Sequence, residues 1–417
     1  MHWQLVSVTL ILLAFAAVSG RLDGTSVTGP MVFTAAGLLV GVKALGLVEP
    51  APGGHEVKLL AEAALTVVLF AEASRTDLGA LSEHFSLPAR LLGIGLPLTI
   101  VAGFLVALPV LGGLDWPEAL LLAVMLAPTD AALGQVVVSL PRLPGRIRRT
   151  LSVESGLNDG ICVPLFFIVL AVAQAEEERM GWRHALRFLV EKIGYGVLSG
   201  ILAGAAAWAV LAVAGRRRGS VLPAWLQIVP LAGAALAFGF AEAIGGSGFI
   251  AAFVGGAAFG ALAAHPGEEA SYLIDEVGVV LAAVTYLVFG AILLGPALSD
   301  LTWAIALYAV LSLTAVRIVP VAISLVGSTS PLPTVGFLGW FGPRGLASII
   351  FALILLEEGG LPHDGLILAA AFVTVGLSVV AHGATAAPLA NAYAEWSEAN
   401  PLGEQSPPLE GSRVTEA

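Results

Sequence analysis

The chain has 417 residues, of which 58% are hydrophobic and only 12% are charged, against about 25% charged residues in a typical soluble domain. This composition excludes an ordinary soluble protein, and the formal net charge of −11 argues against nucleic acid as a partner. A single cysteine, Cys162, excludes an internal disulfide, and the seven histidines show no spacing typical of metal ligands, so we expect no cofactor.

Apolar segments bounded by proline, glycine or charge follow one another along the chain. Because a spanning helix needs about 20 mostly apolar residues, they predict an all-α polytopic membrane protein with about 13 transmembrane helices. The first segment lacks the basic start of a signal peptide, so we count it as a helix. The polar stretch 391–417 predicts a short disordered cytoplasmic tail. The predicted segments are 4–20, 30–48, 56–73, 88–111, 116–140, 149–174, 185–213, 221–243, 248–264, 272–295, 301–326, 332–356 and 365–390.

Basic residues between the segments predict the orientation, because cytoplasmic loops of membrane proteins carry an excess of Lys and Arg. With the N-terminus outside and the C-terminus inside, eleven Lys and Arg residues fall on the cytoplasmic side and six on the other. The loop at 142–149 alone carries four arginines. We therefore expect this orientation, in the inner (cell) membrane of a bacterium or archaeon.

Two segments are interrupted in the middle. Thirteen segments divide into six, one linker and six, which makes the two halves inverted repeats of six. The fifth segment of the first half is broken at 127–130, beside Pro128, and its counterpart in the second half at 342–345, beside Pro343. Paired breaks at matching positions of inverted repeats point to a transporter binding site. The alternative is that each proline only kinks its helix.

The densest polar cluster within the predicted spans lies at 152–160. Residues four apart share a helix face, so Ser155 and Asp159 form one stripe, and Glu154 and Asn158 form a second. A charge at the centre of a bilayer is costly, so it needs a function or a partner. We expect the Ser155 and Asp159 stripe to offer oxygen ligands to a small cation, and Glu154 to require a cationic partner.

Further charged residues fall within or at the ends of the spans. Arg317 and Arg344 are both candidate partners for Glu154, in a pair that mainly holds helices together. Asp130 follows Thr129 at the first break. It either binds a cation together with the freed carbonyls and the Thr129 hydroxyl, or neutralises a positive half-helix end.

In this order, the motifs resemble the monovalent cation:proton antiporter family, in the branch of NhaP-type prokaryotic antiporters and animal sodium/proton exchangers. The resemblance covers about residues 5–390. Its strongest part is Glu-Ser-Gly-Leu-Asn-Asp at 154–159, and the next is Pro-Thr-Asp-Ala-Ala-Leu at 128–133. Supporting motifs lie at 70–73, 247–253 and 342–345.

The resemblance implies an NhaA-like antiporter fold in which two broken helices cross, and usually a homodimer. It implies a transport core, roughly 88–174 and 301–390, and a dimerisation part, roughly 1–48 and 185–264. These parts belong to one transmembrane antiporter domain over residues 1–390, surrounded by membrane lipid.

The resemblance also implies the residues that bind the cation. Asp159 binds the cation and the proton in turn, and Thr129, Asp130 and Ser155 line the site with it. Glu72 is a further candidate, either as an access or binding residue or as a hydrogen-bonded acid at the end of its helix.

Four other roles follow from the same resemblance. Glu154 forms a salt bridge with Arg317, with Asn158 bonded nearby, and Arg344 is a secondary candidate of the second break. Asn158 stands where electrogenic relatives carry a second aspartate, which implies electroneutral one-for-one exchange.

The predicted function is a secondary antiporter, not an enzyme, that exchanges Na⁺, or Li⁺ or K⁺, for H⁺ in pH and cation homeostasis. Burial disfavours the charged form of a carboxylate, so a proton and a cation compete for Asp159, and the neutral site crosses the membrane. One alternative is an uncoupled channel, which would move the cation without opposite proton movement. The other is an organic-anion transporter, which would favour a basic or polar site over two aspartates. An intramembrane protease is disfavoured, because Asp130 and Asp159 lie outside aspartyl-protease motifs. The sequence does not rank the three cations.

Overall fold

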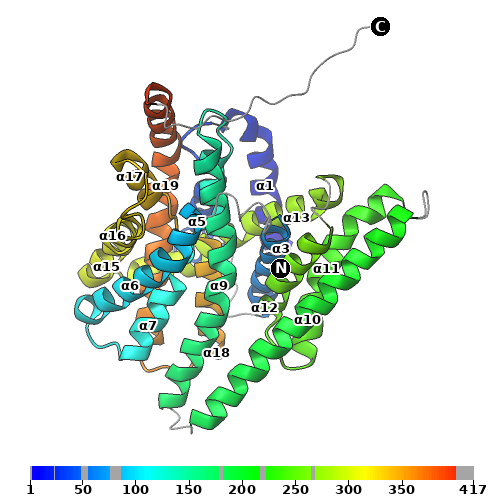
Figure 1. Cartoon of the computed structure of the whole chain (residues 1–417). Coiled ribbons are helices and arrows are strands. Elements are labelled where there is room, and N and C mark those ends of the chain that lie inside the picture. Colours follow the sequence, from blue (N-terminus) through cyan, green and yellow to red (C-terminus); the bar gives the residue numbers. More distant parts are fainter. Residues whose placement is uncertain are drawn as a thin grey trace.

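Every regular element of the described structure, a computed structural model of the chain, is a helix (Figure 1). The structure describes residues 2–22, 24–47, 55–75, 86–177, 182–216, 222–263 and 268–400. Eight of the described helices are long and apolar enough to cross a membrane, and three shorter apolar helices accompany them. The chain is an integral, multi-pass membrane protein, as its sequence predicts.

The first half of the chain contains the first predicted break, which separates α7 (Trp116–Met125) from α8 (Ala131–Val138). The fourth predicted segment is one continuous helical stretch, in which α5 (Ser86–Arg90) passes through a π-helical turn (Leu91–Gly95) into α6 (Leu96–Leu111). The other helices of this half are α1 (His2–Leu22), α2 (Gly29–Val40), α3 (His55–Arg75) and α9 (Gly145–Glu177).

The second half contains the second predicted break, which separates α17 (Leu332–Trp340) from α18 (Leu346–Glu358). An interruption that the sequence did not predict lies at Thr314, between α15 (Trp303–Leu313) and α16 (Ala315–Ser324). Each predicted segment overlaps a helix or consecutive helices, and the number of thirteen crossings stays a prediction. The other helices are α10 (Trp182–Arg216), α11 (Pro223–Ala243), α12 (Gly248–Ala263), α13 (Glu268–Val288), a π-helical turn (Phe289–Leu294), α14 (Gly295–Ser299) and α19 (Asp364–Ala399).

The last helix is longer than predicted. Helix α19 continues to Ala399, so the predicted start of a disordered tail at residue 391 is wrong. Buried Tyr393 stacks on Phe337 of α17, with ring centroids 4.3 Å apart, and shares a 2.8 Å hydrogen bond with the Thr334 hydroxyl. These contacts hold the additional turns in place. The remainder of the predicted tail, 401–417, lies outside the described residues.

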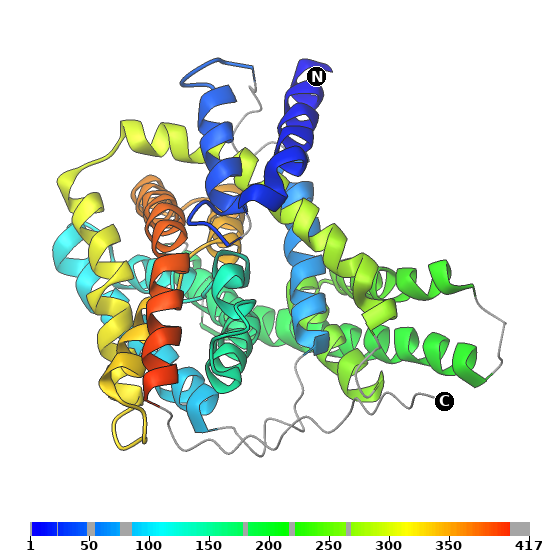
Figure 2. The same ribbon diagram turned by 90° about the horizontal axis from the view of Figure 1, so that it is seen from above.

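The helices form two groups, with α9 between them. In Figure 1, α10, α11 and α12 lie together at the lower right (green), whereas α6, α7, α15 to α17 and α19 lie at the left. Figure 2 shows the same separation from above. The predicted division of the chain into a transport core and a dimerisation part stays a prediction.

Glycines allow helices α10 and α12 to approach each other closely. Gly200 and Gly204 of α10 lie against the backbone of α12, so closely that a Cβ at Gly204 would overlap the carbonyl oxygen of Gly255. In a membrane no hydrophobic force drives helices together, because lipid tails are as apolar as the side chains. Small residues let the helix backbones approach closely enough to pack. This packing holds α10 and α12 together beside α9.

Candidate functional site

The two breaks meet inside the protein. The backbone N–H of Asp130, at the end of the first break, donates a 2.8 Å hydrogen bond to the carbonyl oxygen of Pro343 in the second break. Residues 127–130 and 342–345 are both buried, although neither stretch is helical. Non-helical backbone is tolerated at membrane depth only where protein or a water-filled cavity satisfies it. The two broken helices therefore cross, as predicted, and supply part of each other's hydrogen bonding.

The Asp130 carboxylate joins the N-termini of two half-helices. Its Oδ1 accepts from Leu133 N at 2.9 Å, in the first turn of α8, and its Oδ2 accepts from Leu346 N at 2.5 Å, at the start of α18. The hydroxyl of Tyr286, on α13, donates to the same Oδ2 at 2.7 Å. Helix N-termini attract negative charge. The geometry thus favours the second sequence alternative, in which Asp130 neutralises positive half-helix ends.

Whereas Asp130 contacts positive half-helix ends, the Arg344 side chain contacts a negative one. Its buried guanidinium donates from Nη1 to the carbonyl oxygens of Ala127, at 3.1 Å, and Pro128, at 3.4 Å, which follow the C-terminal end of α7. Carbonyls at the C-terminal end of a helix are the negative end of its dipole. Arg344 therefore belongs to the crossing of the two breaks, and Glu154 is left to pair with Arg317.

Glu154 and Arg317 form a buried ion pair. The distance between Glu154 Oε1 and Arg317 Nη2 is 2.6 Å, and both side chains are almost completely excluded from the surface. The Arg317 side chain passes directly over Gly342, where a Cβ would overlap its Nε. The pair therefore connects α9 and α16 and packs against the second break.

Thr129 connects the first break to α9. The Asn158 amide donates from Nδ2 to Thr129 Oγ1 at 2.7 Å and accepts from Thr129 N at 3.3 Å. The Ser155 and Thr129 hydroxyls lie 3.1 Å apart and share a hydrogen bond. These bonds of Asn158 lead to the first break, not to the Glu154–Arg317 pair. The two stripes expected on α9 thus meet at Thr129.

Asp159 differs from its neighbours in its contacts. It is buried, and its Oδ1 has no hydrogen-bond partner among the described residues. A buried carboxylate that keeps its charge without a partner is strongly destabilising. A bound proton or a bound cation would each remove that penalty.

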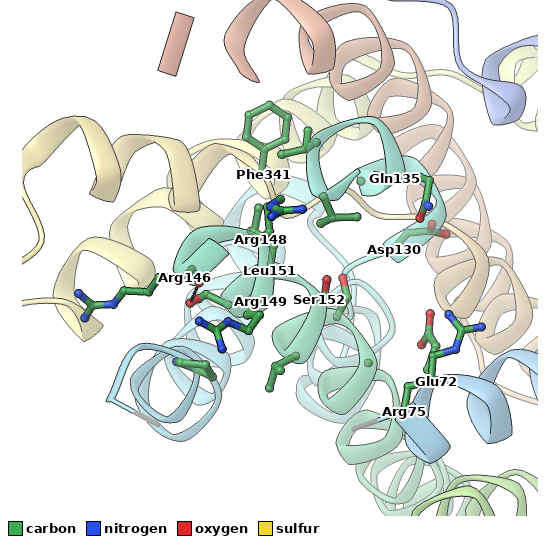
Figure 3. Close-up of a pocket in the computed structure, with 18 of the residues that line it drawn as sticks. Glu72, Arg75, Asp130, Gln135, Arg146, Arg148, Arg149, Leu151, Ser152 and Phe341 are labelled. Atoms are coloured by element: carbon green, nitrogen blue, oxygen red, sulfur yellow. Dashed lines mark hydrogen bonds between the residues drawn. The ribbon is translucent and has the colours of Figure 1, made fainter. Parts of the chain in front are cut away.

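A cavity of about 730 Å³ leads to this region. Asp130, Ser155 and Glu72 border it, which brings three of the predicted residues to one space. Figure 3 shows Glu72 and Arg75 of α3 on one side, near Asp130, and Arg148 and Arg149 near the start of α9 on the other. Asp159 is not among the described residues that line the cavity.

Three residues at the crossing were not predicted. Tyr286 lies in the largely apolar second half of α13 and donates to Asp130. Ser378 and His382, on α19, bond the ends of the second break. Their spacing of four residues on one helix face was the only available signal for the last two.

A buried acid was also missed. Glu118, in the first turn of α7, accepts from the backbone N–H of Asp115, at 3.0 Å, and of His363, at 3.0 Å. The His363 ring lies 2.8 Å from the same carboxylate. These contacts join the start of α7 to the start of α19, away from the two breaks.

Two relatives are similar to this chain in sequence. The K⁺/H⁺ antiporter NhaP of Alkalimonas amylolytica is 29% identical over 369 residues, which cover 86% of this chain and 61% of that protein. The K⁺/H⁺ antiporter NhaP2 of Shewanella oneidensis is 26% identical over 367 residues, 85% of this chain and 61% of that protein. The chain thus spans about three fifths of the length of these two relatives.

A solved structure has the same fold. The sodium proton antiporter MjNhaP1 of Methanocaldococcus jannaschii at pH 8 superposes with a TM-score of 0.72 at 19% identity, and the match covers 90% of this chain and 97% of that one. The family model described as "Sodium/hydrogen exchanger, transmembrane" matches residues 7–392. The crossing of two broken helices, the polar cluster on α9 and this match over nearly the whole chain lead to one conclusion: the chain belongs to the sodium/hydrogen exchanger family of cation:proton antiporters.

Proposed function

We propose that this protein is a secondary active antiporter that exchanges a monovalent cation for H⁺ across the membrane. The observation that carries the proposal is the contrast between two buried aspartates. Asp130 accepts three hydrogen bonds, whereas Asp159 Oδ1 has no partner among the described residues. Within the described part of the chain, Asp159 Oδ1 is buried without a hydrogen bond to stabilise a negative charge, so Asp159 gains from binding a proton or a cation.

The proposed cation ligands are oxygen atoms from two elements. Asp159 and Ser155 come from α9, and the Thr129 hydroxyl, 3.1 Å from the Ser155 hydroxyl, comes from the first break. Oxygen ligands of this kind suit a hard cation. Asp130 contributes negative charge at the cavity while it holds the half-helix ends, and Glu72 is placed to attract the cation into the cavity.

Exchange follows from competition at one carboxylate. A proton and a cation each neutralise Asp159, but they cannot occupy it together, and the empty charged site is costly to move through an apolar surrounding. Each crossing therefore carries one ligand or the other, which couples the two fluxes. Asn158 is bound to Thr129 through both ends of its amide and brings no second charge, so we propose electroneutral one-for-one exchange.

The transported cation is proposed to be Na⁺, with K⁺ as the second candidate. The structural neighbour is a sodium proton antiporter, and the two relatives are K⁺/H⁺ antiporters by name. Li⁺ is a third possible substrate, because it presents the same charge to oxygen ligands. A role in pH and cation homeostasis would follow from any of these exchanges.

The surroundings of the site are proposed from the sequence. We propose a homodimer, a cell-membrane location, an outside N-terminus and an inside C-terminus. The rocking of a transport core, 88–174 and 301–390, against a dimerisation part, 1–48 and 185–264, would give the site access to each side in turn.

The test is a proton-flux assay in sealed vesicles that contain the purified protein. A pH gradient is imposed, the chloride salt of Na⁺, K⁺ or Li⁺ is added, and internal pH is followed with the membrane potential clamped. We expect cation-dependent proton movement for the wild type and none for Asp159→Asn, which removes the charge that both ligands share.

The matched control is Asp300→Asn, the same change at an exposed position at the end of α14. It should exchange at the wild-type rate. Normal exchange by Asp159→Asn would overturn the proposal, and cation movement without proton movement in the wild type would favour a channel.

A further inference from the structure

Helix α19 contacts one backbone group at each end of the second break. One is the carbonyl oxygen of Trp340, the last residue of α17, which also accepts from Gly342 N at 2.8 Å within the break. The other is the N–H of Arg344, which precedes α18. Both groups are bonded by α19. His382 Nε2 lies 3.0 Å from the Trp340 oxygen, and Arg344 N donates to Ser378 Oγ at 2.7 Å.

Ser378 and His382 are also bonded to each other. Ser378 Oγ lies 3.2 Å from His382 Nδ1, one helical turn away. His382 Nδ1 also lies 3.1 Å from the backbone carbonyl oxygen of Ser378. We assign the proton of a neutral ring to Nε2, because this tautomer gives the Trp340 oxygen a donor and lets Nδ1 accept from the Ser378 hydroxyl. Arg344 N–H then donates to the Ser378 hydroxyl, that hydroxyl donates to Nδ1, and Nε2–H donates to the Trp340 carbonyl. The chain of bonds spans the break from one half-helix to the other.

The position of the His382 ring is fixed on its face as well as at its edge. The ring is buried and stacks on the Trp340 indole, with centroids 5.0 Å apart and an interplanar angle of 27°. The indole Nε1 donates in turn to the Thr385 hydroxyl at 2.9 Å. Side chains held by several contacts of this kind are suited to positioning other groups.

Arg344 and Leu346 connect these α19 contacts to the first break. When the Arg344 backbone is held by Ser378, its guanidinium lies on the carbonyls of Ala127 and Pro128. Leu346 N, two residues further, then meets Asp130. The geometry of the whole crossing therefore depends on contacts made by the last helix.

We propose that His382 is a positioning residue for cation binding, which it supports by bridging, with Ser378, the two ends of the second break. The inference rests on the proposed antiport. His382 takes no part in proton transfer, so any side chain that reproduces its donor and its acceptor replaces it. The proposal thus separates a hydrogen-bonding role from a titrating one.

The test compares His382→Phe with His382→Gln in the vesicle assay. Phenylalanine keeps the stack on Trp340 but loses both hydrogen bonds, whereas the glutamine amide offers one donor and one acceptor at a similar separation. We expect His382→Phe to raise the cation concentration for half-maximal exchange by about tenfold, with a smaller change in maximal rate. We expect His382→Gln to stay within about twofold of the wild type for both quantities.

Ser378→Ala provides a second variant, in case His382→Phe does not fold. It removes the other member of the bridge and should raise the half-maximal concentration in the same direction. Because both residues act through one chain of bonds, the double variant Ser378→Ala/His382→Phe should be less impaired than the sum of the two single effects.

The outcomes separate this inference from the proposed antiport. If the wild type shows no coupled exchange, the proposed function fails. If the wild type exchanges but folded His382→Phe and Ser378→Ala variants keep a normal half-maximal concentration, the positioning role is wrong. Failure of a folded His382→Gln variant to restore exchange would also overturn it, since a titrating imidazole would then be required.

Discussion

Asp130 and Arg344 each place their charge on the backbone of the other broken helix. The Asp130 carboxylate accepts the N–H of Leu346 at the start of α18, and the Arg344 guanidinium donates to the carbonyl of Ala127 beyond the end of α7. Interrupting two helices inside a membrane exposes partial charges at the half-helix ends. The two side chains compensate them reciprocally, so neither break is satisfied without the other.

Close packing at Gly345 makes this crossing sensitive to a single methyl group. A Cβ at this position would overlap Asp130 Oδ2 and the Tyr286 hydroxyl. We expect Gly345→Ala to lower the free energy of unfolding by about 1–3 kcal/mol, as overpacking does, and to impair exchange. The measurement is thermal unfolding of the purified protein, combined with the vesicle assay.

Gly336→Ala is the matched control for Gly345→Ala. Gly336 lies within α17, and a Cβ there would meet no atom within 4 Å. Alanine favours a helix over glycine by about 0.5–1 kcal/mol, so this variant should be as stable as the wild type or slightly more so. Equal stability of the two variants would contradict the packing account of Gly345.

The Glu154–Arg317 pair should be far more costly to break than to remove. Glu154→Gln leaves a buried guanidinium without its counter-charge, for which we expect a loss of about 3–5 kcal/mol in stability. The double variant Glu154→Gln/Arg317→Gln leaves no unpaired charge and should recover part of that loss. Thermal unfolding of the two single variants and the double variant measures the coupling.

An exposed ion pair serves as the comparison for the buried one. Arg142 and Glu398 form two 3.0 Å hydrogen bonds at the surface, where solvent screens their interaction. Arg142→Gln should therefore change the unfolding temperature much less than Glu154→Gln. The reverse order would contradict a structural role for the buried pair.

Cation binding should require the hydroxyl of Thr129 rather than the shape of its side chain. Thr129→Val leaves Asn158 Nδ2 and the Ser155 hydroxyl without their common partner, and removes one proposed cation ligand. A lost partner in a buried site costs about 1–3 kcal/mol, so we expect about a tenfold or greater increase in the half-maximal cation concentration. Thr129→Ser keeps the hydroxyl and should restore most of the affinity. If valine and serine behave alike, Thr129 does not bind the cation.

Proton competition predicts the direction of the pH dependence. A fall in pH raises the protonated fraction of the shared carboxylate and so weakens apparent cation binding, by at most about tenfold per pH unit for one proton. Saturating cation should overcome this inhibition, because the two ligands exclude each other. The measurement is the half-maximal cation concentration in vesicles at several equal inside and outside pH values. A half-maximal concentration independent of pH would contradict a shared site.

The sequence predicted the features of this site that follow from general rules for membranes. Charged residues and interrupted helices in an apolar chain are few and need partners, which identified 154–159 and both breaks. The Glu154–Arg317 pair is present in the structure as the resemblance implied. Whether Asp130 binds a cation or compensates helix ends was open, because the answer depends on Leu346, which is more than 200 residues away in the chain.

The features that were missed depend on tertiary contacts. Tyr286 and His382 lie in largely apolar stretches, where an aromatic ring is expected to be an ordinary core residue. Their proximity to the breaks depends on the tertiary structure. The interruption at Thr314 has no proline or glycine, and the Thr314 hydroxyl bonds back to the Val310 carbonyl at 2.6 Å. The helical residues after 390 were assigned to the tail on polarity alone, although Tyr393 packs on α17.

Helix α9 has 33 residues, which makes it about 50 Å long, well beyond the roughly 30 Å thickness of bilayer hydrocarbon. Residues 154–159 occupy less than two turns of this rod. If α9 tilted as a rigid helix, the depth in the membrane of its four polar side chains at 154–159 would change together, and the distances between them would stay constant. The proposed cation ligands on α9, Ser155 and Asp159, would thus move together, and the Thr129 hydroxyl, which belongs to the same proposed core, would move with them.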